Sequence, residues 1–131
     1  MKIVILGGTG LIGKALQKSF SNEHQVHCFN REAFQSVEHL ASLVEGSDLV
    51  IQLSGSTISK RWSNKIVKEM WQSRVDTNQM LSEVVQSLST KPRVICASGI
   101  SFYAESSCND PKTEEDPKGE GYLTNLNIAI E

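Results

Sequence analysis

The chain has 131 residues, which is enough for one domain with a hydrophobic core. Its formal net charge of −2 gives no indication of a surface for nucleic acid or anionic membranes, and no apolar run is long enough to cross a bilayer. An odd number of cysteines without metal-ligand spacing favours a reducing, cytoplasmic compartment, and we expect no metal site. Cys28 and Cys96 fall in predicted strands and are expected to be small buried apolar side chains, and the third cysteine is Cys108.

Short apolar runs and helical periodicities alternate along the chain. Strands are predicted at 2–6, 25–29, 48–53 and 93–97. Helices are predicted at 11–20, 34–44, 64–73 and 75–88, with Ser63 as the N-cap of the third. The polar stretch 105–121 is predicted to be a loop, and 122–131 resembles the start of an unfinished helix.

This alternation predicts an α/β fold, a Rossmann-like doubly wound parallel sheet with right-handed crossovers, in one domain of residues 1–131. In a strand order of 3-2-1-4-5, the connection between the second predicted strand and the next must hold a helix, an edge strand and another helix. The segment from Phe29 to Asp48 is too short for all three. We therefore expect the usual third strand, at the edge of the sheet, and one helix to be missing.

A glycine-rich segment directly follows the first predicted strand and precedes the first predicted helix. This order suits a dinucleotide, because the helix N-terminus offers free N–H groups and a positive dipole end to the pyrophosphate. Glycines at this spacing permit a tight turn, close approach of the phosphates and close helix–strand packing. A purely structural turn is the alternative. The predicted cofactor-binding residues of this segment are Gly7, Gly8, Thr9, Gly10, Leu11, Ile12 and Gly13.

Six short segments carry a resemblance to a known family: Gly7–Gly13, Asp48–Gly55, Lys60–Ser63, Ser73–Val75, Ala97–Tyr103 and Thr113–Pro117. The chain resembles the extended and atypical short-chain dehydrogenase/reductase superfamily (the NAD-dependent epimerase/dehydratase family), in its YfcH-like branch of epimerase-family proteins. The resemblance covers essentially the whole chain but only the N-terminal part of family members, which are roughly twice as long. It implies NADP-dependent oxidoreductase or isomerase chemistry, and a truncated chain that lacks the C-terminal substrate subdomain.

Arg31 follows the second predicted strand, where the ribose of the adenosine should lie. A guanidinium there suits the 2′-phosphate of NADP, which it can contact in bidentate fashion. Asn30 precedes it and no aspartate ends the strand, so NADP(H) is favoured over NAD(H). Glu32 weakens this interpretation by repelling phosphate, and an ordinary surface arginine is the alternative.

Leu53, Ser54 and Gly55 end the third predicted strand beside the expected cofactor crevice, although a simple strand-ending turn explains them equally well. By resemblance, Arg74 stands where many members have an asparagine tied to the cofactor region. It either bridges to backbone near Gly55 or pairs with an acidic residue on its own helix. Arg61–Trp62 could hold an anionic or sugar-nucleotide group, or the indole could simply pack on its own domain.

The resemblance also implies catalytic positions. The superfamily uses a Ser or Thr after the fifth strand and a Tyr-x-x-x-Lys pair, in which the lysine lowers the pKa of the tyrosine. The candidates are Ser98, Tyr103 and Tyr122. Leu126 stands where the lysine should follow Tyr122, so the activating partner is absent at that position. Tyr103 is more simply explained as a packing aromatic.

The sequence therefore predicts the NADP(H)-binding domain of a nucleotide-sugar epimerase or reductase that is not catalytic as the chain stands. The alternative is a catalytically inactive dinucleotide-binding or sensor module, or a degenerate remnant. The expected partners are a dinucleotide and an unidentified substrate, with neither nucleic acid nor membrane. The resemblance implies a homodimer through the predicted helices at 75–88 and 122–131.

Overall fold

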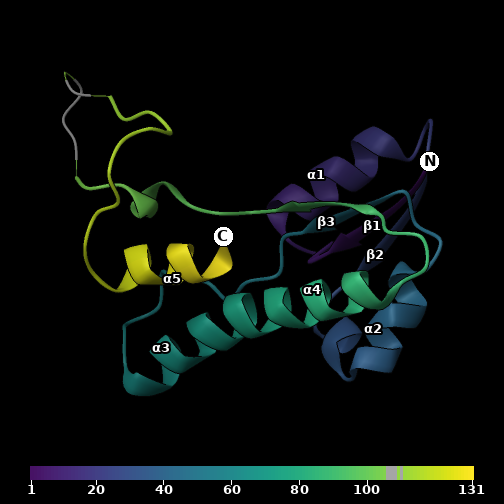
Figure 1. Ribbon diagram of the computed structural model, residues 1–131, viewed down its shortest axis with the longest axis horizontal. Helices are drawn as coiled ribbons and strands as arrows, with labels where there is room; N and C mark the ends of the chain where they lie inside the picture. The colour runs from purple at the N-terminus through teal and green to yellow at the C-terminus, as the bar shows by residue number, and fades with distance from the viewer. Residues whose placement is uncertain (106–108, 110) are drawn as a thin grey trace. The chain divides into compact units, whose positions relative to one another are not determined.

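The computed structural model describes residues 1–105, 109 and 111–131 (Figure 1). The described residues form two compact units, Met1–Ala97 and Ser98–Glu131, and each is described by itself. Cys108 lies outside the described residues.

The first unit is built on a parallel sheet of four strands in the order β2-β1-β3-β4. The strands are β1 (Lys2–Leu6), β2 (Gln25–Phe29), β3 (Leu49–Gln52) and β4 (Arg93–Cys96). β2 lies at the edge, and the segment between Phe29 and Leu49, which is described throughout, forms helices and no strand. The prediction that the usual third strand is missing is therefore confirmed.

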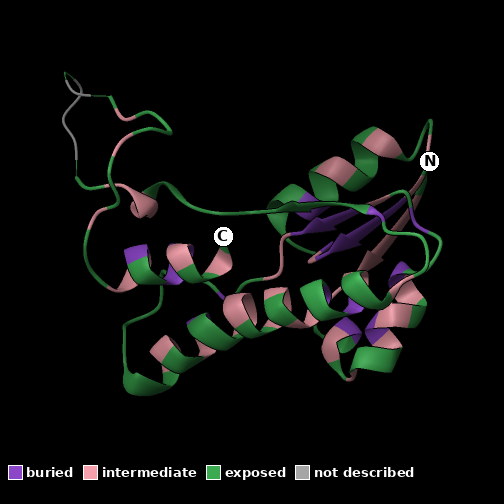
Figure 2. Cartoon of the chain, in the orientation of Figure 1, coloured by how far each residue is buried: buried purple, intermediate pink, exposed green. Residues whose placement is uncertain are grey.

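Helices cover both faces of this sheet (Figure 1). They are α1 (Leu11–Phe20) on one face and α2 (Val37–Val44) and α4 (Thr77–Ser87) on the other. α3 (Asn64–Trp71) precedes α4 along the chain and contributes no side chain to either buried cluster. On one face, Ile3 and Ile5 form a buried cluster with side chains of α1 packed against it. On the other face, Val4 and Leu6 form a buried cluster with side chains of α2 and α4. The side chains of β1 are thus buried on both faces of the sheet, and the buried strands are purple in Figure 2. This explains why the sequence of β1 is an unbroken apolar run.

Three predicted helices differ from the observed ones. The helix predicted at 34–44 is divided, because Arg31–Phe34 forms a 3-10 helix and α2 begins only at Val37, where the Ser36 hydroxyl accepts a hydrogen bond from the His39 N–H. The helices predicted at 64–73 and 75–88 form one continuous run, joined by a π-helical turn at Gln72–Asp76. This run contains no glycine or proline that would interrupt it.

The strand β4 is more exposed than expected. In the described part of the chain it pairs only with β3, so its other edge is open. Ile95 is 55 % exposed, and Cys96, which was expected to be a buried apolar side chain, is exposed. Cys28 on β2 is half-buried, and this burial raises the pKa of its thiol.

The second unit holds a 3-10 helix (Ile100–Phe102), which the sequence did not predict, and α5 (Tyr122–Ile130). Two side chains of α5 bind the backbone near the 3-10 helix: the Thr124 hydroxyl donates to the Ser101 carbonyl at 2.7 Å, and the Asn127 amide donates to the Gly99 carbonyl at 3.0 Å. None of the helices in the described residues has the length and apolar character needed to span a membrane.

Candidate functional site

The glycine-rich segment forms the turn between β1 and α1, and it packs too closely for side chains at three of its glycines. A Cβ at Gly8 would lie 2.4 Å from Cβ of Cys28. Gly7 has a φ of +92°, and a Cβ placed there would lie 2.9 Å from the carbonyl carbon of Leu53. A Cβ at Gly13 would lie 2.5 Å from the carbonyl oxygen of Gly7. The side chains of Leu11 and Ile12 are 90 % and 59 % exposed. The backbone N–H groups of these two residues lie in the first turn of α1, where no intrahelical carbonyl can accept them, so they are available to an anion.

The end of β2 is tied to this turn by Asn30. Its Oδ1 accepts hydrogen bonds from the backbone N–H of Thr9 at 3.1 Å and from the Thr9 hydroxyl at 2.7 Å. The backbone N–H of Asn30 donates to Oε1 of Glu32 at 2.8 Å. Hydrogen bonds from the N–H groups of Glu32 and Asn30 hold the pKa of the Glu32 carboxyl below its usual range. Arg31, between them, is exposed.

A cavity of about 730 Å³ lies where these segments meet the end of β3. It lies at the carboxyl ends of parallel strands, where α/β sheets bind ligands. Of the described residues that line it, only Arg31 carries a positive charge. Eight predicted cofactor-binding residues line it: Gly7, Thr9, Gly10, Asn30, Arg31, Leu53, Ser54 and Gly55. Five others do not: Gly8, Leu11, Ile12, Gly13 and Arg74.

The cavity is also lined by residues that were not among the predicted site residues. Glu32 and Phe34 follow β2, and Ser56 follows β3. The others come from α3, the π-helical turn and the start of α4: Glu69, Gln72, Ser73 and Thr77. The only sequence signal near them was the family-like segment Ser73–Val75, which did not reveal that the helix widens there.

Ser54 is the side chain in the cavity wall whose polar atom is least satisfied. Its Oγ is buried and has no hydrogen-bond partner within the described residues. A buried hydroxyl without a partner is costly, so a polar ligand that reaches it would fit this wall. Arg74 lies behind the wall, because a Cβ at Gly55 would be 2.9 Å from Cζ of its guanidinium. This agrees with the alternative in which Arg74 approaches the backbone near Gly55.

The three candidate catalytic residues lie in the second unit, so their roles stay predictions. The Ser98 hydroxyl donates to Oε1 of Glu131 at 2.6 Å. Tyr103 packs edge-on against Phe102, with ring centroids 5.1 Å apart, which suits a packing aromatic. Tyr122 is the first residue of α5, and Leu126, at the position of the family's lysine, is buried.

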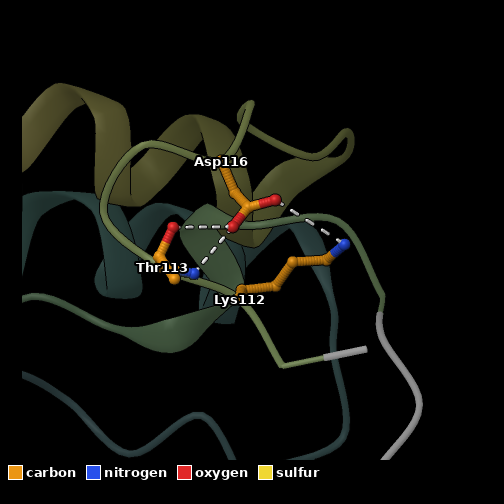
Figure 3. A network of polar contacts seen from close by, with 3 residues as sticks. All are labelled: Lys112, Thr113 and Asp116. Atoms are coloured by element: carbon orange, nitrogen blue, oxygen red, sulfur yellow. Dashed lines mark hydrogen bonds and ion pairs between the residues drawn. The ribbon is translucent and has the colours of Figure 1, made fainter. Parts of the chain in front are cut away.

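The acidic segment of the second unit forms a local turn (Figure 3). The backbone N–H and the hydroxyl of Thr113 donate to Oδ2 of Asp116 at 2.7 and 3.0 Å, and Nζ of Lys112 lies 3.9 Å from Oδ1. These hydrogen bonds, with a smaller effect of the Lys112 charge, lower the pKa of the Asp116 carboxyl. In the described residues no group of three or more His, Cys, Asp or Glu side chains could hold a metal ion.

Comparisons with curated proteins find relatives that share part of their length with this chain. The chain is 30% identical over 113 residues to the epimerase family protein SSP1921 of Staphylococcus saprophyticus. This alignment covers 76% of this chain and 38% of that protein. It is 28% identical over 136 residues to the mouse epimerase family protein SDR39U1, covering 96% of this chain and 46% of the relative. The chain thus spans less than half the length of these relatives.

Solved structures show the same fold. The human epimerase family protein SDR39U1, crystallised with NADPH, matches 99% of this chain with a TM-score of 0.83 and 24% identity, over 47% of its own length. A nucleoside-diphosphate sugar epimerase from Corynebacterium glutamicum matches 99% of this chain with a TM-score of 0.78 and 25% identity, over 29% of its own length. The family model of the NAD dependent epimerase/dehydratase family matches residues 3–125. The chain therefore belongs to the NAD dependent epimerase/dehydratase family.

Proposed function

We propose that the first unit binds NADP(H), as the dinucleotide-binding part of a nucleotide-sugar epimerase or reductase. The observation that carries the proposal is the cavity at which the glycine turn, the end of β2 and the end of β3 meet. The free N–H groups of the first turn of α1 would bind the pyrophosphate, and Ser54 and Gly55 would line the nicotinamide-side part of the ligand. When bound, the nicotinamide would supply a hydride donor or acceptor.

The preference for NADP(H) over NAD(H) rests on the charges at the end of β2. Arg31 is the only cationic side chain among the described residues that line the cavity, and a guanidinium can grip the 2′-phosphate. Glu32 is the acidic residue directly after Arg31. Its Oε1 accepts the N–H of Asn30, and no aspartate ends β2 to bind a free ribose hydroxyl. The human relative SDR39U1, whose structure was solved with NADPH, has the same fold and supports this preference.

The test is a calorimetric titration of the chain with NADPH and with NADH. NADPH should bind more tightly, and Arg31→Ala should weaken NADPH by about tenfold to a hundredfold, the worth of a charge-assisted contact, with little change for NADH. Lys18→Ala is the matched control, because Lys18 is an exposed cation in the last turn of α1 and does not line the cavity. Equal affinity for both dinucleotides, or an equal loss in both variants, would contradict the preference.

A second candidate is a dinucleotide-binding or sensor module without catalysis. The observation that favours it is Leu126, which is 1 % exposed within α5 at the position where the family's lysine would follow Tyr122. A buried leucine can neither lower the pKa of a tyrosine nor relay a proton. The check is product analysis of a set of nucleoside-diphosphate sugars incubated with the chain and NADP(H) or NAD(H). We expect no conversion, and any epimer or reduced product absent from a Tyr122→Phe variant would exclude this candidate.

We also propose a homodimer in which α4 and α5 form the interface, as the family resemblance implies. Light scattering at several concentrations should give the mass of two chains. A monomer at the highest concentration would contradict it.

A further inference from the structure

Two parts of the cavity lining are connected by hydrogen bonds that begin at Gln52. One is the strand-end segment Ser54–Ser56, and the other, the helical wall, consists of Glu69, Gln72, Ser73 and Thr77. Gln52 ends β3 and is 2 % exposed. It pairs in register with Leu6, which belongs to the apolar cluster facing α2 and α4, so its amide lies on the apolar face of the sheet. A buried amide there must find partners. Its Nε2 donates to the Thr77 hydroxyl at 3.3 Å, and its Oε1 accepts the backbone N–H of Ser54 at 3.1 Å.

Thr77 carries the connection into the helical wall. It is the first residue of α4, directly after the π-helical turn, and Figure 1 shows α3 and α4 as one run. Its Oγ lies 3.0 Å from the Ser73 carbonyl oxygen and 3.1 Å from the Arg74 carbonyl oxygen. The hydroxyl has one proton, so it donates to these carbonyls while accepting from Gln52. π-helical turns are rare and occur frequently at functional sites.

The π-helical turn also binds the strand-end segment directly. The backbone N–H of Ser56 donates to the Ser73 hydroxyl at 2.9 Å, and the two hydroxyl oxygens lie 3.2 Å apart. Ser56 is buried, and both it and Ser73 line the cavity. The segment Ser54–Ser56 is therefore held at both ends, through the N–H of Ser54 by Gln52 and through the N–H of Ser56 by Ser73.

We propose that Gln52 and Thr77 are positioning residues for dinucleotide binding, which fix Ser54–Ser56 against the π-helical turn before the ligand arrives. The inference rests on the proposed function. Neither residue needs to touch the ligand in this role. Because they order the segment Ser54–Ser56 in the free protein, ligand binding does not have to overcome the entropy cost of ordering it. Without the Thr77 hydroxyl, the amide of Gln52 loses its acceptor in an apolar environment, and its hold on the N–H of Ser54 weakens.

The test compares Thr77→Val with Thr77→Ser in the full chain. Valine keeps the branched shape but removes the hydroxyl, and serine keeps the hydroxyl. NADPH affinity should fall about tenfold in Thr77→Val, the worth of one hydrogen bond, and should stay within about twofold in Thr77→Ser. Exchange of the Ser54 amide proton, followed by NMR, should accelerate only in Thr77→Val. Should Thr77→Val fail to fold, Gln52→Asn, which is one methylene shorter, is expected to weaken NADPH in the same direction.

Val84→Ala is the control for general loss of stability, because Val84 is fully buried in α4 and does not line the cavity. It should lower the Tm while leaving NADPH affinity unchanged. If the wild-type chain binds NADPH and Thr77→Val binds it equally well, these hydrogen bonds only stabilise the fold and the inference is wrong. If the wild-type chain binds neither NADPH nor NADH, the proposed function itself fails, and the inference fails with it.

Discussion

Substitutions at two glycines of the same turn should separate stability from binding. A Cβ at Gly13 would lie 2.5 Å from the Gly7 carbonyl oxygen and 2.7 Å from Cα of Gly8. Both neighbours are backbone, so α1 must move away from the end of β1. Overpacking of this kind costs about 1–3 kcal/mol. At about 4 °C per kcal/mol for a chain of this size, Gly13→Ala should lower the Tm by about 4–12 °C.

Gly10→Ser is the matched contrast. Gly10 is the N-cap of α1 with extended backbone, and a Cβ there would meet only the Gly7 carbonyl oxygen at 3.3 Å. Serine is a better N-cap than glycine, so its Tm should stay within about 2 °C of wild type. Its side chain would lie at the cavity wall, so NADPH binding should be lost. The assays are thermal unfolding followed by circular dichroism, and calorimetric titration. A Gly13→Ala variant as stable as wild type, or a Gly10→Ser variant destabilised as strongly as Gly13→Ala, would refute the packing argument.

Three further outcomes are expected. Ser54→Ala removes a buried hydroxyl that has no partner in the described residues. The free energy of unfolding, measured in urea, should therefore rise by about 1 kcal/mol, while the affinity for NADPH should fall. A loss of stability would show that the hydroxyl is satisfied. Ser36→Ala removes the acceptor for the N–H of His39 at the start of α2 and should cost about 1 kcal/mol in the same urea assay, so an unchanged midpoint would disprove the capping role. The folded-state pKa of Asp116 is lowered below its unfolded value of about 4, so its stabilising effect is present above that pH and is lost as the pH falls through the lowered pKa. NMR titration should find the Asp116 carboxyl titrating below pH 4, and Thr113→Val should raise that pKa; an ordinary pKa in the wild type would contradict the turn.

Local signals determined the elements of the first unit closely. The observed α1 and β2 have the predicted bounds, because each is a short periodic segment between clear turn residues. The strand order followed from the same signals, since parallel strands with right-handed crossovers leave few arrangements and the segment after Phe29 was too short for another strand. The glycine turn was predictable because its requirements lie within seven consecutive residues and concern backbone space.

The helical wall of the cavity was decided only by the tertiary structure. The π-helical turn at Gln72–Asp76 has no distinct composition, and the sequence pattern predicts two separate helices there. Gln52 looked like an ordinary strand end, although its amide binds residues on two other segments. Such contacts join positions up to 25 residues apart, so periodicity and turn chemistry within a short window carry no information about them. The sequence by itself determined the glycine turn between β1 and α1, because its requirements are local, and long-range packing decided which side chains line the cavity beside that turn.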